Sequence, residues 1–124
     1  MDLTTEEKGW LEPVHLSCQD PFGNLIVCSV KGHNHLINRH PEMEGCDDEI
    51  QSTIENPDKI FTSRDRPDRS VFFRSRGENV SPKEKYNKVV TQKVVPGIEC
   101  VVSAWFQPNV KGGIASVKYQ KPED

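Results

Sequence analysis

The second half of the chain is a succession of short β-rich segments separated by turn residues, and this pattern constrains the fold most. Its most apolar segment, Ile98–Phe106, follows the turn signal Pro96-Gly97 and is predicted to be a central strand. The preceding segment, Tyr86–Val95, alternates partly between apolar and polar residues, as a half-buried strand does. Further strands are predicted at Ile60–Thr62, Val71–Phe73 and Ile114–Tyr119.

The first half of the chain begins with a predicted β-hairpin. Val14–Cys18 and Leu25–Val30 are rich in apolar residues, and the turn cluster Asp20–Asn24 lies between them. Proline fixes one backbone angle in this cluster, and glycine or asparagine accepts a positive one. The chain is therefore expected to reverse direction there.

Two short helices are predicted after the hairpin. The first covers His33–Glu44, and it either ends near His40 or restarts with Pro41 in its first turn, because an interior proline removes a backbone donor. The second begins at Asp47, where acidic residues interact favourably with the exposed amides of a helix N-terminus. It ends at Asn56-Pro57.

This order of elements predicts an α+β domain: an N-terminal β-hairpin, one or two short helices, then a four- to five-stranded antiparallel β-meander. The domain is expected to cover residues 13–120, after a flexible segment 1–12 and before a C-terminal tail 121–124. A length of 124 residues suits one domain, and an apolar content of 34% favours long polar loops.

Charge is unevenly distributed along the sequence. Residues 1–58 contain 3 Lys and Arg against 12 Asp and Glu, whereas residues 59–93 contain 10 against 4. The cationic middle segment is either a solvated loop and edge strand or a surface for the phosphates of a nucleic acid. The overall net charge of −3 argues against a general role in nucleic-acid packaging.

Membrane, secretory and metal-binding functions are not predicted. The sequence has no apolar run of membrane-spanning length and no secretory signal, so we expect a soluble, cytoplasmic protein without a membrane partner. The cysteines have no zinc-knuckle spacing, and reduced thiols are favoured over two disulfides. A zinc set drawn from the early histidines is disfavoured by its spacing, so no metal or cofactor is expected. The zinc set considered consists of His33, His35, His40 and Cys46. The remaining cysteines are Cys18, Cys28 and Cys100.

The segment HLINRHPE at His35–Glu42 resembles the helix motif of the phage barnase–EndoU–colicin–RelE-like nucleases. Three further segments occur in the order of that family: Ile54–Ile60, Lys88–Val90 and Val101–Trp105. The resemblance implies a barnase-like ribonuclease fold, with helices before a four-stranded antiparallel meander. It also implies RNA cleavage, as a toxin or a phage-linked effector. Ser103 stands where the family's penultimate strand usually carries threonine.

Metal-independent RNA cleavage needs a base for the 2′-hydroxyl, an acid for the leaving oxygen and cations for the phosphorane. The predicted catalytic residues are His35, Arg39, His40 and Ser103, and the predicted substrate-binding residues are Arg74, Arg76, Lys88 and Tyr119. His35 and Arg39 are four residues apart and share a helix face, whereas His40 would point elsewhere on a helix. Each also has an ordinary interpretation, such as a solvated charge, a salt bridge or a backbone hydrogen bond.

Two functions therefore compete. The first is an endoribonuclease that acts on RNA by acid–base chemistry, and an active enzyme of this kind would need a protein inhibitor in its host. The second is a non-catalytic RNA- or protein-binding module on the same fold, which the acidic first half and Ser103 favour.

Overall fold

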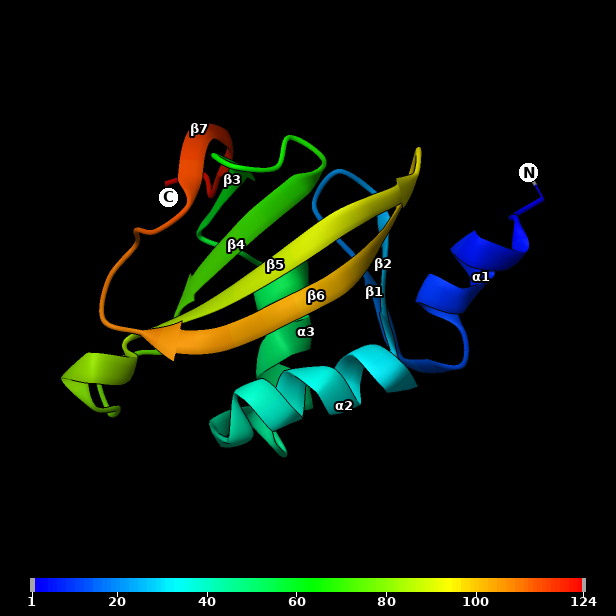
Figure 1. Cartoon of the computed structure of the whole chain (residues 1–124). Coiled ribbons are helices and arrows are strands. Elements are labelled where there is room, and N and C mark those ends of the chain that lie inside the picture. Colours follow the sequence, from blue (N-terminus) through cyan, green and yellow to red (C-terminus); the bar gives the residue numbers. More distant parts are fainter. Residues whose placement is uncertain (1, 124) are drawn as a thin grey trace.

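A computed structural model describes residues 2–123 and confirms the α+β class (Figure 1). The helices are α1 (Thr5–Leu11), α2 (Val30–Arg39) and α3 (Asp47–Glu55), with 3₁₀ turns at Pro41–Met43 and Pro82–Glu84. The strands are β1 (Val14–Gln19), β2 (Leu25–Ser29), β3 (Lys59–Ser63), β4 (Arg69–Ser75), β5 (Tyr86–Val95), β6 (Ile98–Gln107) and β7 (Ile114–Gln120). Within this part of the chain, no helix has the length and apolarity needed to cross a membrane.

The strands described form one mixed sheet of seven, in the order β1-β2-β6-β5-β4-β3-β7. Strands β3 to β6 form the antiparallel meander that the sequence predicts. Two pairings differ from the prediction. Leu25–Val27 of β2 pair in parallel with Ile98–Cys100 of β6, and β7 pairs with β3 instead of β6. Both join segments that are far apart in sequence, so local patterns carry no signal for them.

The main hydrophobic core lies between one face of the sheet and helices α2 and α3. Every second residue of a strand points into this core, so β4 contributes Phe72 and β5 contributes Val89. Both side chains are 0% exposed. Ile50 and Ile54 face it from α3, as the four-residue spacing predicts. This core holds the two helices against the sheet.

The opposite face of the sheet carries two smaller apolar clusters. Leu11 of α1 packs with Val27 and Cys100 in one of them. Phe61, Val71 and Phe73 form the other, on β3 and β4. The partly buried Val102 packs against the first cluster and Val90 against the second. A polar hollow on this face is lined by both of these valines.

Residues 1–12 were expected to be flexible, but residues 5–11 form helix α1. Its N-terminus is a capping box in which the Thr4 hydroxyl accepts from the Glu7 amide and the Glu7 carboxylate accepts from the Thr4 amide. Leu11 anchors the helix to the sheet with 5% of its surface exposed. In the predicted tail, residues 121–123 have no regular structure, and Met1 and Asp124 lie outside the described residues.

All four cysteines are free thiols, as expected for reduced residues. Burial raises the pKa of the Cys28 thiol to about 12 and that of Cys18 to about 11. At pH 8 the thiolate fraction of Cys28 is therefore on the order of 10⁻⁴.

We expect iodoacetamide to label the half-buried Cys46 first, and Cys18 and Cys28 to react faster as pH rises. Mass spectrometry of the native protein checks this order, and equal labelling of Cys28 and Cys46 would contradict it.

Candidate functional site

Helix α2 runs alongside β6 because β2 leads directly into it (Figure 1). The Ser29 hydroxyl caps the helix by accepting the Gly32 amide at 2.9 Å. A side chain at Gly32 would place its Cβ 3.1 Å from the Ser29 Oγ and 3.6 Å from the Val101 carbonyl. Glycine therefore lets the first turn of α2 lie against β6. The predicted shared face of His35 and Arg39 then borders the open side of the sheet.

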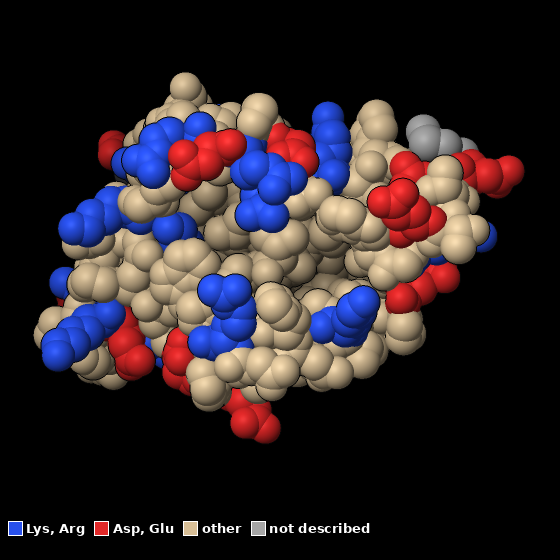
Figure 2. Space-filling model, viewed as in Figure 1, with Lys and Arg blue, Asp and Glu red and all other residues tan. Residues whose placement is uncertain are grey.

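A cavity of about 470 Å³ lies between the end of α2 and the open face of the sheet. The sheet contributes Arg69, Val90, Val102, Ser103 and Trp105, and the chain around the end of α2 contributes His35, Arg39 and His40. All four predicted catalytic residues thus line one cavity. Figure 2 shows this side of the molecule hollowed at its centre, with Lys and Arg side chains above and below the hollow.

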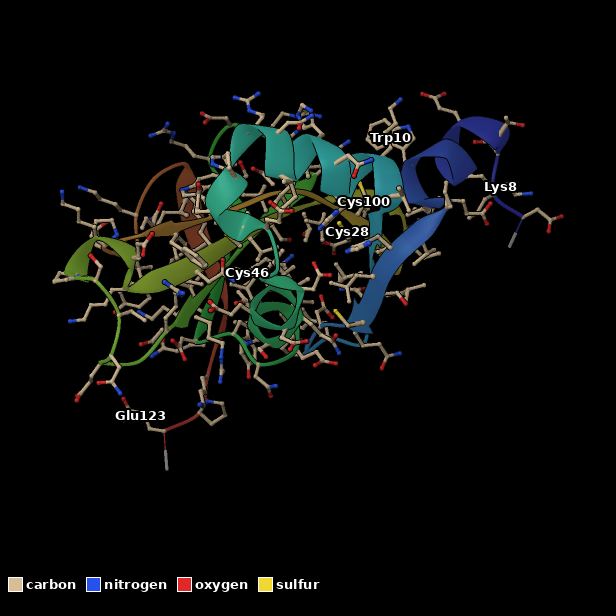
Figure 3. The ribbon with its side chains drawn as sticks, turned by 90° about the horizontal axis from the view of Figure 1, so that it is seen from below. Lys8, Trp10, Cys28, Cys46, Cys100 and Glu123 are labelled. Atoms are coloured by element: carbon tan, nitrogen blue, oxygen red, sulfur yellow. The ribbon has the colours of Figure 1, made fainter. Side chains whose placement is uncertain are left out.

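A second cavity, of about 430 Å³, shares His35, Arg69 and Val102 with the first. It extends along the sheet to Lys31 and to Trp10 of α1, which is 42% exposed. Figure 3 shows Trp10 at the surface, beside α2. The two cavities together form one elongated depression, which we call the α2 groove.

His40 is not where helical periodicity would place it. The helix ends at Arg39, and His40 adopts a non-helical backbone conformation with φ −135° and ψ 74°. Its ring turns back to stack on Trp105, with the ring centroids 5.2 Å apart and the planes inclined by 23°. His40 Nδ1 lies 3.4 Å from a carboxylate oxygen of Glu42. His40 therefore joins His35 in the groove, and its Nε2 is the ring atom left for a ligand.

Sequence reasoning missed Arg69 and Trp105. Arg69 begins β4 opposite Gln92 of β5, and its Nε donates to the Gln92 side-chain oxygen at 3.1 Å. The two-residue alternation that places Phe72 in the core places Arg69 on the open face. Once Phe72 is assigned to the core, this alternation is the sequence signal that identifies Arg69. Among residues 2–123, no carboxylate oxygen lies within 4.0 Å of the Arg39 or Arg69 guanidinium. Their positive charges are available to an anion.

Two predicted substrate-binding residues lie elsewhere. Arg74 and Arg76 line a separate cavity of about 300 Å³ beside α3. Arg74 has the same strand parity as Phe72, so it points to the helix-covered face, where it donates to the Asn56 carbonyl. Arg76 donates to both carboxylate oxygens of Glu49 at 2.7 and 3.0 Å. Arg74 and Arg76 therefore do not line the cavity that contains the predicted catalytic residues.

The Arg76–Glu49 pair is expected to be structural. The Arg76 side chain is 15% exposed and also stacks 3.5 Å above the Phe106 ring. Hydrogen bonds to charged groups typically contribute about 1.5–3 kcal/mol, so we expect Arg76→Ala to lower the free energy of unfolding by about that amount. Urea denaturation measures the change. A loss no greater than that of the surface variant Arg64→Ala would contradict this assignment.

The other two predicted substrate-binding residues have structural partners. Lys88 is buried on the open face, where its Nζ donates to the Gly112 carbonyl at 2.9 Å and lies 4.7 Å from the Trp105 ring centroid. Burial lowers the pKa of its ammonium group. Tyr119 is on the edge strand β7 and packs against the main core on the helix-covered face. Lys88 thus supports the groove from beside Trp105, and Tyr119 lies away from it.

Comparisons with known proteins give no guide to the role of the α2 groove. No family model, no curated protein and no solved structure matches the chain. Among the described residues, the α2 groove offers two imidazoles, two guanidinium groups without carboxylate partners, the Lys31 ammonium group, the hydroxyls of Ser29 and Ser103, and two indole rings. This is a set of donors and aromatic surfaces suited to an anionic, aromatic ligand.

Proposed function

We propose that the protein is a metal-independent endoribonuclease whose active site is the α2 groove. The observation that carries the proposal is the convergence of His35, Arg39, His40 and Ser103 on one cavity, although they come from α2, its C-terminal cap and β6. Histidines suit proton transfer near neutral pH, and arginines suit phosphate because their donors form a planar fork. The cavity volume of about 470 Å³ lies within the usual range for small-ligand sites.

The proposed reaction is an attack of a ribose 2′-oxygen on the adjacent phosphorus. One histidine of the His35–His40 pair takes the 2′-hydroxyl proton, and the other protonates the departing 5′-oxygen. Arg39 and Arg69 stabilise the charge that develops on the non-bridging oxygens, and the Ser103 hydroxyl donates to one of them. The P–O5′ bond breaks as the 2′-O–P bond forms, leaving a 2′,3′-cyclic phosphate and a free 5′-hydroxyl.

The indole rings at the two ends of the α2 groove suit bases on either side of the cleaved bond. Stacking on an aromatic side chain contributes about 1–3 kcal/mol per base and tolerates any base. Trp10 is exposed in the part of the groove that Lys31 also lines, whereas His40 covers one face of the Trp105 ring and leaves its other side for a base. We therefore propose single-stranded RNA as the substrate, since its bases are free to unstack.

The test is incubation of the whole protein with a 5′-labelled single-stranded RNA in excess EDTA. We expect cleavage, products that end in a 2′,3′-cyclic phosphate, and no cleavage of the same strand carrying 2′-O-methyl groups. The methyl group removes the nucleophilic proton and leaves the phosphates unchanged. RNA that is bound but not cut, with or without Mg²⁺, would favour the non-catalytic module. An RNA that is neither bound nor cut would overturn both.

A further inference from the structure

A second cluster of polar side chains lies on the other side of α2, outside the α2 groove. His15 on β1, His33 on α2 and Asp47 at the start of α3 bring three potential ligand atoms within 4.8 Å of one another. His15 Nε2 lies 2.9 Å from one Asp47 oxygen, and His33 Nε2 lies 3.4 Å from the other. Figure 3 shows β1, α2 and α3 together on the side viewed from below. Sequence spacing could not reveal this set, since its members come from three separate elements.

The cluster is incomplete as a network of hydrogen bonds alone. The Asp47 Oδ1 is buried and has no hydrogen-bond partner, although the His33 ring nitrogen faces it. A buried polar atom without a partner is costly. The His15 and His33 rings stack at a centroid distance of 3.8 Å, and both present the same nitrogen to one carboxylate. A small cation held between the three groups would give both ring nitrogens and the buried Asp47 Oδ1 a partner.

We propose that His15, His33 and Asp47 bind a zinc ion. Two imidazole nitrogens and one carboxylate oxygen are ligands that Zn²⁺ accepts, whereas Mg²⁺ and Ca²⁺ favour oxygen ligands alone. Zinc bonds of about 2.0–2.2 Å bring such atoms close together, and three protein ligands leave one position for water. Because the ligands come from β1, α2 and α3, the ion fastens the hairpin to both helices.

The zinc site is separate from the proposed catalytic groove. His33 and His35 are two residues apart on α2, which turns their side chains to opposite sides of the helix. His33 faces Asp47, whereas His35 lines the groove. Zinc binding can therefore be present or absent independently of RNA cleavage.

Calorimetric titration of the EDTA-treated, dialysed protein with ZnCl₂ tests the proposal. We expect one Zn²⁺ per chain and a higher melting temperature in its presence. Removing a ligand in His15→Ala, His33→Ala or Asp47→Asn should weaken binding by at least about 100-fold, more than the loss typical of a group outside the metal's ligands. The matched controls His35→Ala and Asp48→Asn each remove the same chemical group nearby, and they should bind within about twofold of the original protein.

Ring-nitrogen NMR of the unaltered protein identifies the ligands even if a variant fails to fold. The Nε2 resonances of His15 and His33 should shift on adding one equivalent of ZnCl₂, and those of His35 and His40 should not. Shifts at His35 and His40, equal affinity in every variant, or binding weaker than about 100 µM would each overturn the proposal.

Discussion

Alanine in place of His35 or His40 is expected to slow RNA cleavage by about 10²–10⁴-fold, because a positioned acid or base contributes a factor of this size. Both rings line the groove, and His40 is also held by Trp105 and Glu42. Single-turnover rates on a short RNA in EDTA measure the loss. Circular dichroism of the same preparations shows whether each variant retains its fold.

Arg39→Ala and Arg74→Ala provide a matched comparison for the same assay. Both remove one guanidinium group from the surface of a cavity, but Arg39 lines the α2 groove and Arg74 lines the cavity beside α3. We expect Arg39→Ala to reduce the rate and Arg74→Ala to leave it within about twofold. Full activity in the two histidine variants, together with a reduced cleavage rate in Arg74→Ala, would instead place the active site in the cavity beside α3.

Phe72→Ala is expected to lower the free energy of unfolding by about 3–5 kcal/mol, the range observed when a buried phenylalanine is truncated. The side chain is 0% exposed in the main core, between the sheet and the helices. Urea denaturation followed by tryptophan fluorescence measures the change.

Phe22→Ala is the control for this measurement, since it removes the same atoms from a side chain that is 51% exposed. Surface substitutions usually change stability by no more than about 0.5 kcal/mol. Similar losses in Phe22→Ala and Phe72→Ala would mean that the core is not where the structure places it.

The strands of the meander were predictable because each carries its signal locally. The apolar segment at Ile98–Phe106 and the alternation in Tyr86–Val95 became β6 and β5, with the turn at Pro96-Gly97 between them. Helix α1 also had a local signal, the Thr4–Glu7 capping box, but its short apolar pattern made the segment look unstructured.

The candidate site was predictable only in part, for a geometric reason. The four-residue spacing of His35 and Arg39 places both on one helix face, and the structure agrees. Arg69 and Arg74 are five residues apart on β4, which pairs with β5 without a bulge, so they lie on opposite faces of the sheet. Charge alone does not tell which of these faces the helices cover, so Arg74 was predicted to bind substrate and Arg69 was missed.

The parallel pairing of β2 with β6 has a consequence for how the protein is made. On the ribosome, Leu25–Val27 emerge long before their partners Ile98–Cys100, and chain synthesis proceeds at about 5–20 residues per second. Until β6 has emerged from the ribosome, the hairpin and α1 lack the strand on which they pack, whereas β3 and β4 can already pair. The β2 edge of the nascent N-terminal region therefore stays unpaired for several seconds, and an unpaired strand edge is prone to aggregation.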